Sequence, residues 1–240
     1  MPNRSRDKQL AKLAARRHAE RQAAKRRRDI TLGVVAPAVE PPATVACGGE
    51  APDDAGAKTP QYVGPPPMTI DPKAAYTATV ATSCGTFEVR LRPDIAPQAV
   101  NSFVFLADRG FYDGLTFHRI VDGFVIQGGD PLGDGTGGPG YPFDIETSPE
   151  QTFDAAGLLA YANSGPGTNG SQFFVTLAPT PDLDPGGTAG EFSIFGEVTR
   201  GLDVVEAIGA VPVTQNPTSG EPSVPTEAVY IDSVTIDERG

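Results

Sequence analysis

Hydrophobic and polar residues alternate along two neighbouring segments in the first half of the chain. Residues 75–82 and 86–91 place apolar side chains at every second position on either side of a short turn, which is typical of a half-buried β-hairpin. Over residues 97–109 the apolar spacing becomes helical, with Gly110 at the carboxyl end, and residues 202–209 repeat this spacing. The pattern therefore predicts a hairpin and two helices.

The remaining apolar segments are short and are separated by glycine-rich turns, the last of them covering residues 228–236. Many short strands with only two helices indicate a mainly β fold with a sheet that closes on itself. The chain of 240 residues could hold one large domain or two small ones, and its 28 glycines and 24 prolines suit the many turns.

Charge divides the chain into unequal parts. Residues 1–29 hold eleven Lys and Arg against three acids, whereas residues 30–240 hold eight Lys and Arg against 27 acids. We predict a basic, helical arm over residues 1–29, a disordered linker rich in Pro, Gly and Ala over residues 30–72, and a globular domain over residues 73–238. The acidic domain is not expected to attract nucleic acid through its charge.

The basic arm has two interpretations. Its apolar stripe is too narrow to pack against a globular body, which favours a solvated helix. Clusters of Lys and Arg are also attracted to anionic membrane surfaces and to nucleic acid, so either is a possible partner of the arm. The sequence leaves these alternatives open.

The segment that follows the arm bears on localisation. Residues 30–47 are mildly apolar but contain Pro37, Glu40 and two further prolines, which makes a poor membrane-spanning helix. Residues 44–47 weakly resemble a lipoprotein cleavage site, although Thr44 is an unsuitable residue type there. A cytoplasmic protein is expected ahead of a membrane-tethered or exported one, and neither alternative is excluded.

The cysteines and histidines are few and far apart. The chain has two of each, and such scattered residues do not form a metal site, which needs three or four ligands at close spacing. We therefore expect no metal. Cys47 and Cys84 could form a disulfide if the protein is exported.

The first candidate site lies over residues 117–130, Phe-His-Arg-Ile-Val-Asp-Gly-Phe-Val-Ile-Gln-Gly-Gly-Asp. It places Arg119 among aromatic and aliphatic residues and Gln127 before a Gly-Gly turn. A guanidinium is almost never fully buried unless it is paired, so a cation at the rim of an apolar surface indicates a site. The alternative is a surface arginine on an edge strand.

A second motif covers residues 160–177, Ala-Tyr-Ala-Asn-Ser-Gly-Pro-Gly-Thr-Asn-Gly-Ser-Gln-Phe-Phe-Val-Thr-Leu. It indicates two short strands joined by a dense turn. The Gly-x-Gly-x-x-Gly pattern at residues 133–138 is interpreted as a loop, because Pro139-Gly140 follows where a dinucleotide site needs a helix. A serine hydrolase is disfavoured because the chain has no Gly-x-Ser-x-Gly elbow.

Taken together, the two motifs and the later Phe195-Gly196 resemble the cyclophilin family of peptidyl-prolyl isomerases, here of bacterial type, over about residues 76–236. The resemblance implies a closed eight-stranded antiparallel β-barrel capped by two α-helices. It implies isomerase activity on X-Pro bonds without a cofactor, as a folding helper for proline-containing peptides and unfolded or nascent proteins, in a monomer. The alternative is a proline-peptide binding module without turnover.

The resemblance also implies roles for individual residues. Arg119 matches the catalytic donor of the family, and Gln127 and Phe124 stand beside it as catalytic residues. The substrate-binding residues implied are Val125, Ala162, Asn163, Phe174 and Leu183. The backbone at Ala162 and Asn163 is expected to pair with an extended peptide, and the other three residues with Phe124 to form a proline pocket.

Three positions depart from the family pattern. Asp182 stands where many members have a tryptophan, Phe192 where a histidine is common, and Tyr161 where methionine is frequent. All three are expected to border the pocket, so that inhibitor affinity and substrate preference change while catalysis is retained. Phe117 and Phe173 are expected inside the barrel, and His118 is expected to be a satisfied structural histidine.

Overall fold

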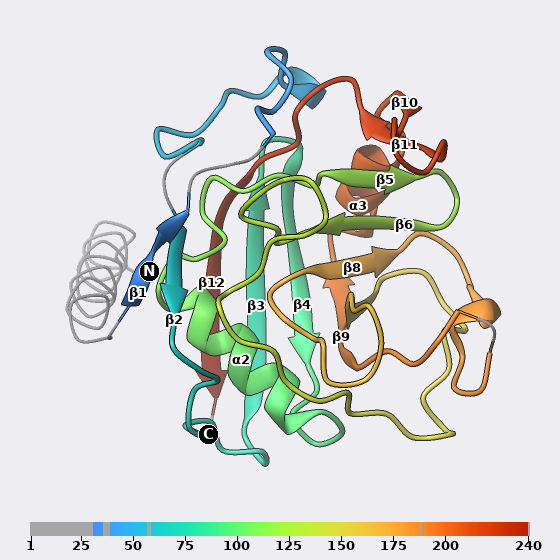
Figure 1. Ribbon diagram of the computed structural model, residues 1–240. Helices are drawn as coiled ribbons and strands as arrows, with labels where there is room; N and C mark the ends of the chain where they lie inside the picture. Colours follow the sequence, from blue (N-terminus) through green and yellow to red (C-terminus); the bar gives the residue numbers. More distant parts are fainter. Residues whose placement is uncertain (1–30, 36–38, 57–58, 188, 240) are drawn as a thin grey trace, which may run out of the picture. The chain divides into compact units, whose positions relative to one another are not determined.

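The computed structural model describes residues 31–35, 39–56, 59–187 and 189–239, and Figure 1 shows their arrangement. The arm predicted over residues 1–29 lies outside the described residues. The elements are β1 (Thr31–Val35), η1 (Ala46–Gly48), β2 (Thr59–Tyr62), β3 (Ala75–Thr82), β4 (Gly85–Leu91), α2 (Pro97–Ala107), β5 (Arg119–Val121), β6 (Val125–Gly128), β7 (Leu158–Tyr161), β8 (Phe173–Thr176), η2 (Pro181–Leu183), β9 (Ile194–Arg200), α3 (Leu202–Gly209), β10 (Val213–Gln215), β11 (Pro222–Pro225) and β12 (Ile231–Arg239). None of the described helices has the length and apolar character needed to cross a membrane.

Eight strands form one antiparallel sheet in the order β12-β3-β4-β9-β7-β8-β6-β5. The edge strands β12 and β5 do not pair with each other, so the predicted closed barrel is wrong and the sheet is a half-barrel. Because β5 has only three residues, the hydrogen bonds between the two edges of the sheet are made by residues just before β5 and residues at or just before the start of β12. Phe117 N donates to Val229 O at 2.9 Å, and Ile231 N donates to Leu115 O at 2.7 Å.

The hairpin and both helices predicted from hydrophobic spacing are confirmed. The hairpin is β3–β4, and α2 begins with a proline at its first turn and buries Val100, Phe103 and Leu106 in the core. In α3 Val205 and Ile208 are fully buried, whereas Leu202, at the first position of the helix, is exposed.

Residues 39–56 and 59–72, hereafter the strap, do not form the disordered linker that their composition suggested. Ala46, Tyr62 and Ile70 are buried in the main core, and Cys47 is joined by a disulfide to Cys84 of the β3–β4 turn. Proline and glycine are typical of linkers, but each of these three apolar residues packs against the core of the domain. Burial of widely spaced residues leaves no periodic pattern in the sequence.

The strap also holds residues 131–140, hereafter the pocket loop. Val39 N donates to Leu132 O at 3.0 Å and Tyr62 N to Pro139 O at 2.8 Å, while Gln61 Nε2 donates to Gly138 O at 2.9 Å. Irregular loops need such partners, because buried backbone groups are costly when unpaired. The strap therefore fixes a loop that, as described next, lines a cavity.

Candidate active site

The β5–β6 hairpin brings Arg119 and Gln127 together. The two residues are directly opposite each other in the antiparallel register, so their side chains lie on the same face. Arg119 Nη1 donates to Gln127 Oε1 at 3.3 Å, and both side chains are half-buried. The pairing that places these two predicted residues side by side follows from the short turn between β5 and β6.

Arg119 has a second partner that the sequence did not suggest. Its Nε and Nη2 atoms each donate to one carboxylate oxygen of Glu221, both at 2.8 Å. This hydrogen bond holds the pKa of the Glu221 carboxyl below its ordinary value, as expected for a carboxylate beside a cation. The two residues are 102 positions apart, and no local pattern links them.

Gln172 extends the polar side of the site. Gln127 Nε2 donates to Gln172 Oε1 at 3.0 Å. Gln172 Nε2 donates in turn to Gly135 O at 3.0 Å and to Gly137 O at 2.9 Å in the pocket loop. Gln172 lies in the second motif, next to the paired phenylalanines, but its contact with Gln127 depends on the pairing of β6 with β8. We name Glu221, Arg119, Gln127 and Gln172 the polar row.

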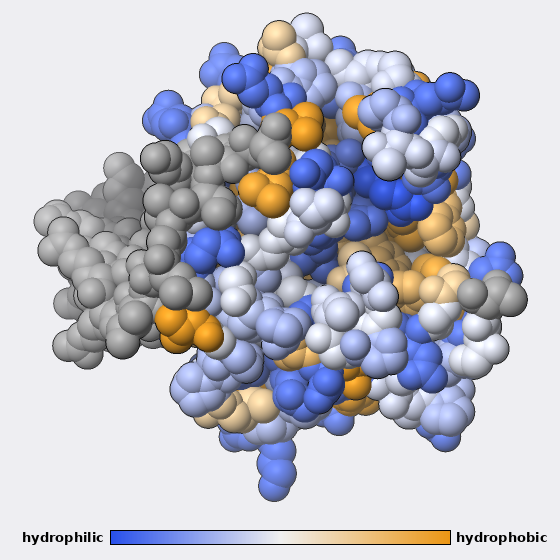
Figure 2. All heavy atoms as spheres, in the orientation of Figure 1, coloured by the Kyte–Doolittle hydropathy of each residue, from blue (hydrophilic) through white to orange (hydrophobic). Residues whose placement is uncertain are grey.

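An apolar cluster lies on the same strands. Its buried members are Val125, Phe153, Ala160, Phe174, Leu183 and Ile194, and Phe124, Leu158, Ala162 and Phe192 pack against them. The Phe174 ring stacks on Phe153 with centroids 5.9 Å apart and meets the edge of Phe192 at 5.6 Å. In Figure 2 hydrophobic residues gather on the surface over β6 and β8, below a hydrophilic band near β10 and β11.

The predicted pocket residues Phe124, Val125, Phe174 and Leu183 thus belong to one cluster. Phe153 and Phe192 complete it. Phe192 was expected at the pocket border, whereas Phe153 was missed because it stands in an irregular segment without a repeating pattern. The polar row and the apolar cluster share the β6 strand, on which Val125 and Gln127 are two residues apart.

A cavity of about 410 Å³ adjoins the polar row. Gln127, Ala162, Asn163 and Gln172 line it together with small residues of the pocket loop and of the second motif. Ala162 N already donates to Gln172 O at 2.9 Å. Among the hydrogen bonds of the described residues, none involves the backbone N–H of Asn163.

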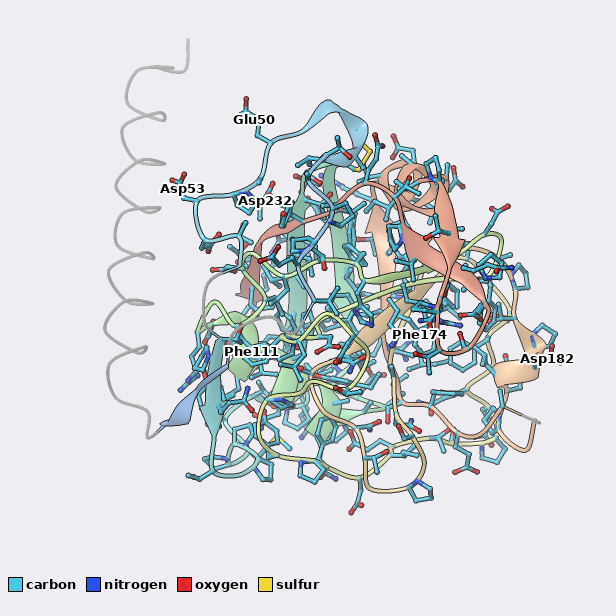
Figure 3. The ribbon with its side chains drawn as sticks, turned by 45° about the horizontal axis from the view of Figure 1, so that its top comes forward. Glu50, Asp53, Phe111, Phe174, Asp182 and Asp232 are labelled. Atoms are coloured by element: carbon cyan, nitrogen blue, oxygen red, sulfur yellow. A yellow bond between two sulfur atoms is a disulfide. The ribbon has the colours of Figure 1, made fainter. Side chains whose placement is uncertain are left out.

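Three other sequence expectations are resolved by the structure. Phe117 and Phe173 are buried in the core as expected. Tyr161 is not at the pocket border but fully buried in the main core, stacked on Phe195 at 4.5 Å. It stands opposite Phe173 on β8 and so faces the main core with it. Asp182 is exposed, and Figure 3 shows it projecting from the edge of the molecule while Phe174 lies toward the middle.

His118 differs from its expectation. Both ring nitrogens are shielded from solvent and have no hydrogen-bond partner among the described residues, so the histidine is not satisfied by neighbouring protein groups. Burial is the largest influence on its ring and lowers its pKa, which favours the neutral form. The residue lies beside Arg119 in sequence but takes no part in the polar row.

Comparison with known proteins decides the family. A family model described as cyclophilin type peptidyl-prolyl cis-trans isomerase/CLD matches residues 77–236. The chain belongs to this cyclophilin family of peptidyl-prolyl isomerases. Among curated cyclophilins it is 48% identical to peptidyl-prolyl cis-trans isomerase B of Streptomyces anulatus, over 68% of this chain and 97% of that protein. It is 45% identical to peptidyl-prolyl cis-trans isomerase A of Mycobacterium tuberculosis, over 70% and 96%.

Solved cyclophilin structures agree with the fold. The chain is similar to a cyclophilin type peptidyl-prolyl cis-trans isomerase from Cryptosporidium parvum crystallised in the presence of the dipeptide Ala-Pro, with a TM-score of 0.60 and 33% identity. The match covers 68% of this chain and 99% of that one. The cyclophilin region includes both the polar row and the apolar cluster, whereas the whole strap lies before residue 77.

Proposed function

We propose that this cyclophilin accelerates rotation about X-Pro peptide bonds by binding the proline ring in the apolar cluster and presenting Arg119 to the proline nitrogen. The observation that carries the proposal is the position of a paired but accessible guanidinium beside a buried aromatic cluster on the same sheet. Unfolded and nascent proteins that expose X-Pro bonds are the proposed substrates.

The chemistry requires only stabilisation of a twisted peptide. Conjugation between the nitrogen lone pair and the carbonyl gives a rotational barrier of about 18–20 kcal/mol, and uncatalysed X-Pro exchange takes tens to hundreds of seconds. When the bond is twisted, conjugation is lost and the proline nitrogen can accept a hydrogen bond. A donor aimed at that nitrogen binds the transition state more tightly than either planar isomer, which is the condition for catalysis. No covalent bond breaks and no proton moves.

The remaining site residues hold the peptide. Phe124, Val125, Phe174 and Leu183 enclose the ring, and Gln127 donates to a substrate carbonyl. The backbone at Ala162 and Asn163 pairs with the extended peptide, as in recognition by an added strand. The nearby cavity accepts a side chain that precedes the proline. The alternative role, proline-peptide binding without turnover, would need the cluster but not Arg119.

The test compares catalysis by the natural protein and by Arg119→Ala on an Ala-Pro test peptide. Removing one preorganised donor from a water-poor site costs about 10²–10³ in rate, so a fall of that size is expected. Arg92→Ala is the matched control, because Arg92 makes a similar fork with Asp94, both bonds being 2.9 Å. Arg92 follows β4, which β9, β7 and β8 separate from β6 in the sheet. The control substitution should leave catalysis unchanged.

Two results would count against the proposal. If Arg119→Ala retains natural turnover, Arg119 is not the donor. If the natural protein accelerates exchange no more than Arg119→Ala does while still binding the peptide, the non-catalytic binding module becomes the better account.

A further inference from the structure

The bidentate pair between Arg119 and Glu221 is a feature of the site that the proposed chemistry does not itself require. Glu221 accepts from the Nε and Nη2 edge of the guanidinium, both bonds being 2.8 Å long. Fork-on-fork pairs of this kind fix the plane of a guanidinium as well as attracting it. The acid comes from the β10–β11 hairpin, which lies next to β5 in Figure 1.

The hairpin turn holds Glu221 in place. The Asn216 side chain accepts from the backbone N–H groups of Thr218 and Ser219 at 2.9 and 3.1 Å. Asn216 N donates to Glu221 O at 2.7 Å, and Gly220, with a φ of +74°, supplies the left-handed residue that closes the turn. Pro222 follows Glu221 and restricts it to extended conformations. The carboxylate is therefore presented from a constrained backbone.

The pairing leaves donors on Arg119 for another group. A guanidinium has five N–H groups. Two of them are used by Glu221 and one by Gln127, through Nη1 at 3.3 Å. Among the described contacts, one N–H remains on Nη1 and one on Nη2. Glu221 thus occupies one edge of the guanidinium and not all of it.

We infer that Glu221 is a positioning residue for isomerisation, which holds the Arg119 guanidinium in the plane that directs its remaining N–H groups at the proline nitrogen. This inference rests on the proposed function. An unpaired arginine would sample many rotamers and would lose that freedom in the transition state, whereas the paired one is already ordered. Glu221 therefore acts on the rate through Arg119 and does not touch the peptide.

The experiment is a double-mutant cycle with Glu221→Gln, which keeps the shape of the side chain and removes its charge. In the natural background, the substitution should lower the rate of exchange on the enzyme roughly three- to tenfold, the factor that corresponds to ordering one long side chain. Peptide affinity should change less than about twofold. In the Arg119→Ala background the same substitution should have no further effect, because its only route to the reaction is absent.

A control and a direct readout separate positioning from a purely structural role. Glu197→Gln removes the partner of Arg90 on β4, and the Glu197 side chain is 37% exposed against 36% for Glu221; this substitution should leave the rate unchanged. The NMR signals of the Arg119 guanidinium should show slow rotation about its terminal bonds in the natural protein and faster rotation in Glu221→Gln. A slower reaction without faster rotation of the guanidinium would indicate a purely structural role and would overturn the inference.

Each outcome bears on one claim. If Arg119→Ala is slow but Glu221→Gln retains the natural rate, the inference fails and the proposed function stands. If Glu221→Gln is faster than the natural protein, Glu221 holds Arg119 away from the peptide and slows the reaction, which overturns the inference. If Glu221→Gln slows both backgrounds equally, Glu221 acts independently of Arg119. If Arg119→Ala itself retains the natural rate, the proposed function has failed.

Discussion

The two sides of the site, the apolar cluster and the polar row, are assembled in different ways. Most predicted members of the cluster come from two short motifs, whose strands β6 and β8 pair directly. The polar row takes Arg119, Gln127 and Gln172 from the same two motifs, but it ends at Glu221, 102 residues from Arg119. Contacts between neighbouring strands can be inferred from local patterns, whereas the orientation of a long side chain depends on whichever distant group reaches it.

This difference has a physical consequence for function. The cluster provides a surface for the proline ring in both planar isomers and in the twisted state. The binding energy that it contributes is therefore the same in all three states. The polar row provides directed hydrogen bonds, which can favour the twisted state alone. Changes to the cluster should therefore alter affinity and stability together, and changes to the polar row should alter the rate.

The largest effect on stability is expected for Phe174→Ala. The ring is 5% exposed and stacks on Phe153, and such truncations cost about 3–5 kcal/mol. The free energy of unfolding, measured with denaturant, should fall by this amount, and peptide affinity should fall together with the rate at low peptide concentration, kcat/KM. Phe105→Ala, which removes a ring packed on Tyr62 in the main body, should destabilise without weakening the peptide. Unchanged peptide affinity in Phe174→Ala would show that the cluster does not bind the proline ring.

A similar effect on stability, without one on the site, is expected from the disulfide. Cys47 and Cys84 are 37 residues apart, a loop for which chain entropy suggests roughly 4 kcal/mol of stabilisation. The Cys47→Ser/Cys84→Ser double variant should lose up to this much free energy of unfolding relative to the oxidised protein. Peptide affinity should change less than about threefold, because Tyr62 is buried independently and its backbone still holds the pocket loop. Free thiols in protein purified without reductant would contradict the pairing.

The smallest effect concerns the pH dependence of the Arg119–Glu221 pair. Because its folded-state pKa is lowered, Glu221 contributes stability above the ordinary glutamate pKa of about 4.3 and loses it as pH falls through the lowered folded-state pKa. The pair is partly exposed, so its contribution is about 1 kcal/mol or less. The difference in free energy of unfolding between the natural protein and Glu221→Gln should be full at pH 7 and vanish in acid. A difference that persists in acid would contradict the charge-based account.

The sequence predicted the main hairpin, both helices and the cluster residues because each rests on a local signal: period-two alternation, helical spacing or a short motif. The predicted closure of the sheet was wrong, because local signals do not show how far an edge strand extends, and β5 has only three residues. The strap was mistaken for a linker because Ala46, Tyr62 and Ile70 are isolated in sequence and become buried only through tertiary contacts. Glu221 was missed for the same reason.

The most direct test of the central claim is the rate of cis-trans exchange of a saturating Ala-Pro peptide on the enzyme, measured by NMR together with the dissociation constant. For Arg119→Ala the account predicts an on-enzyme rate lower by about 10²–10³ and a dissociation constant raised less than about tenfold. For Phe174→Ala it predicts a marked rise in the dissociation constant. Equal losses of rate and affinity in Arg119→Ala would contradict the claim that the arginine acts on the twisted state.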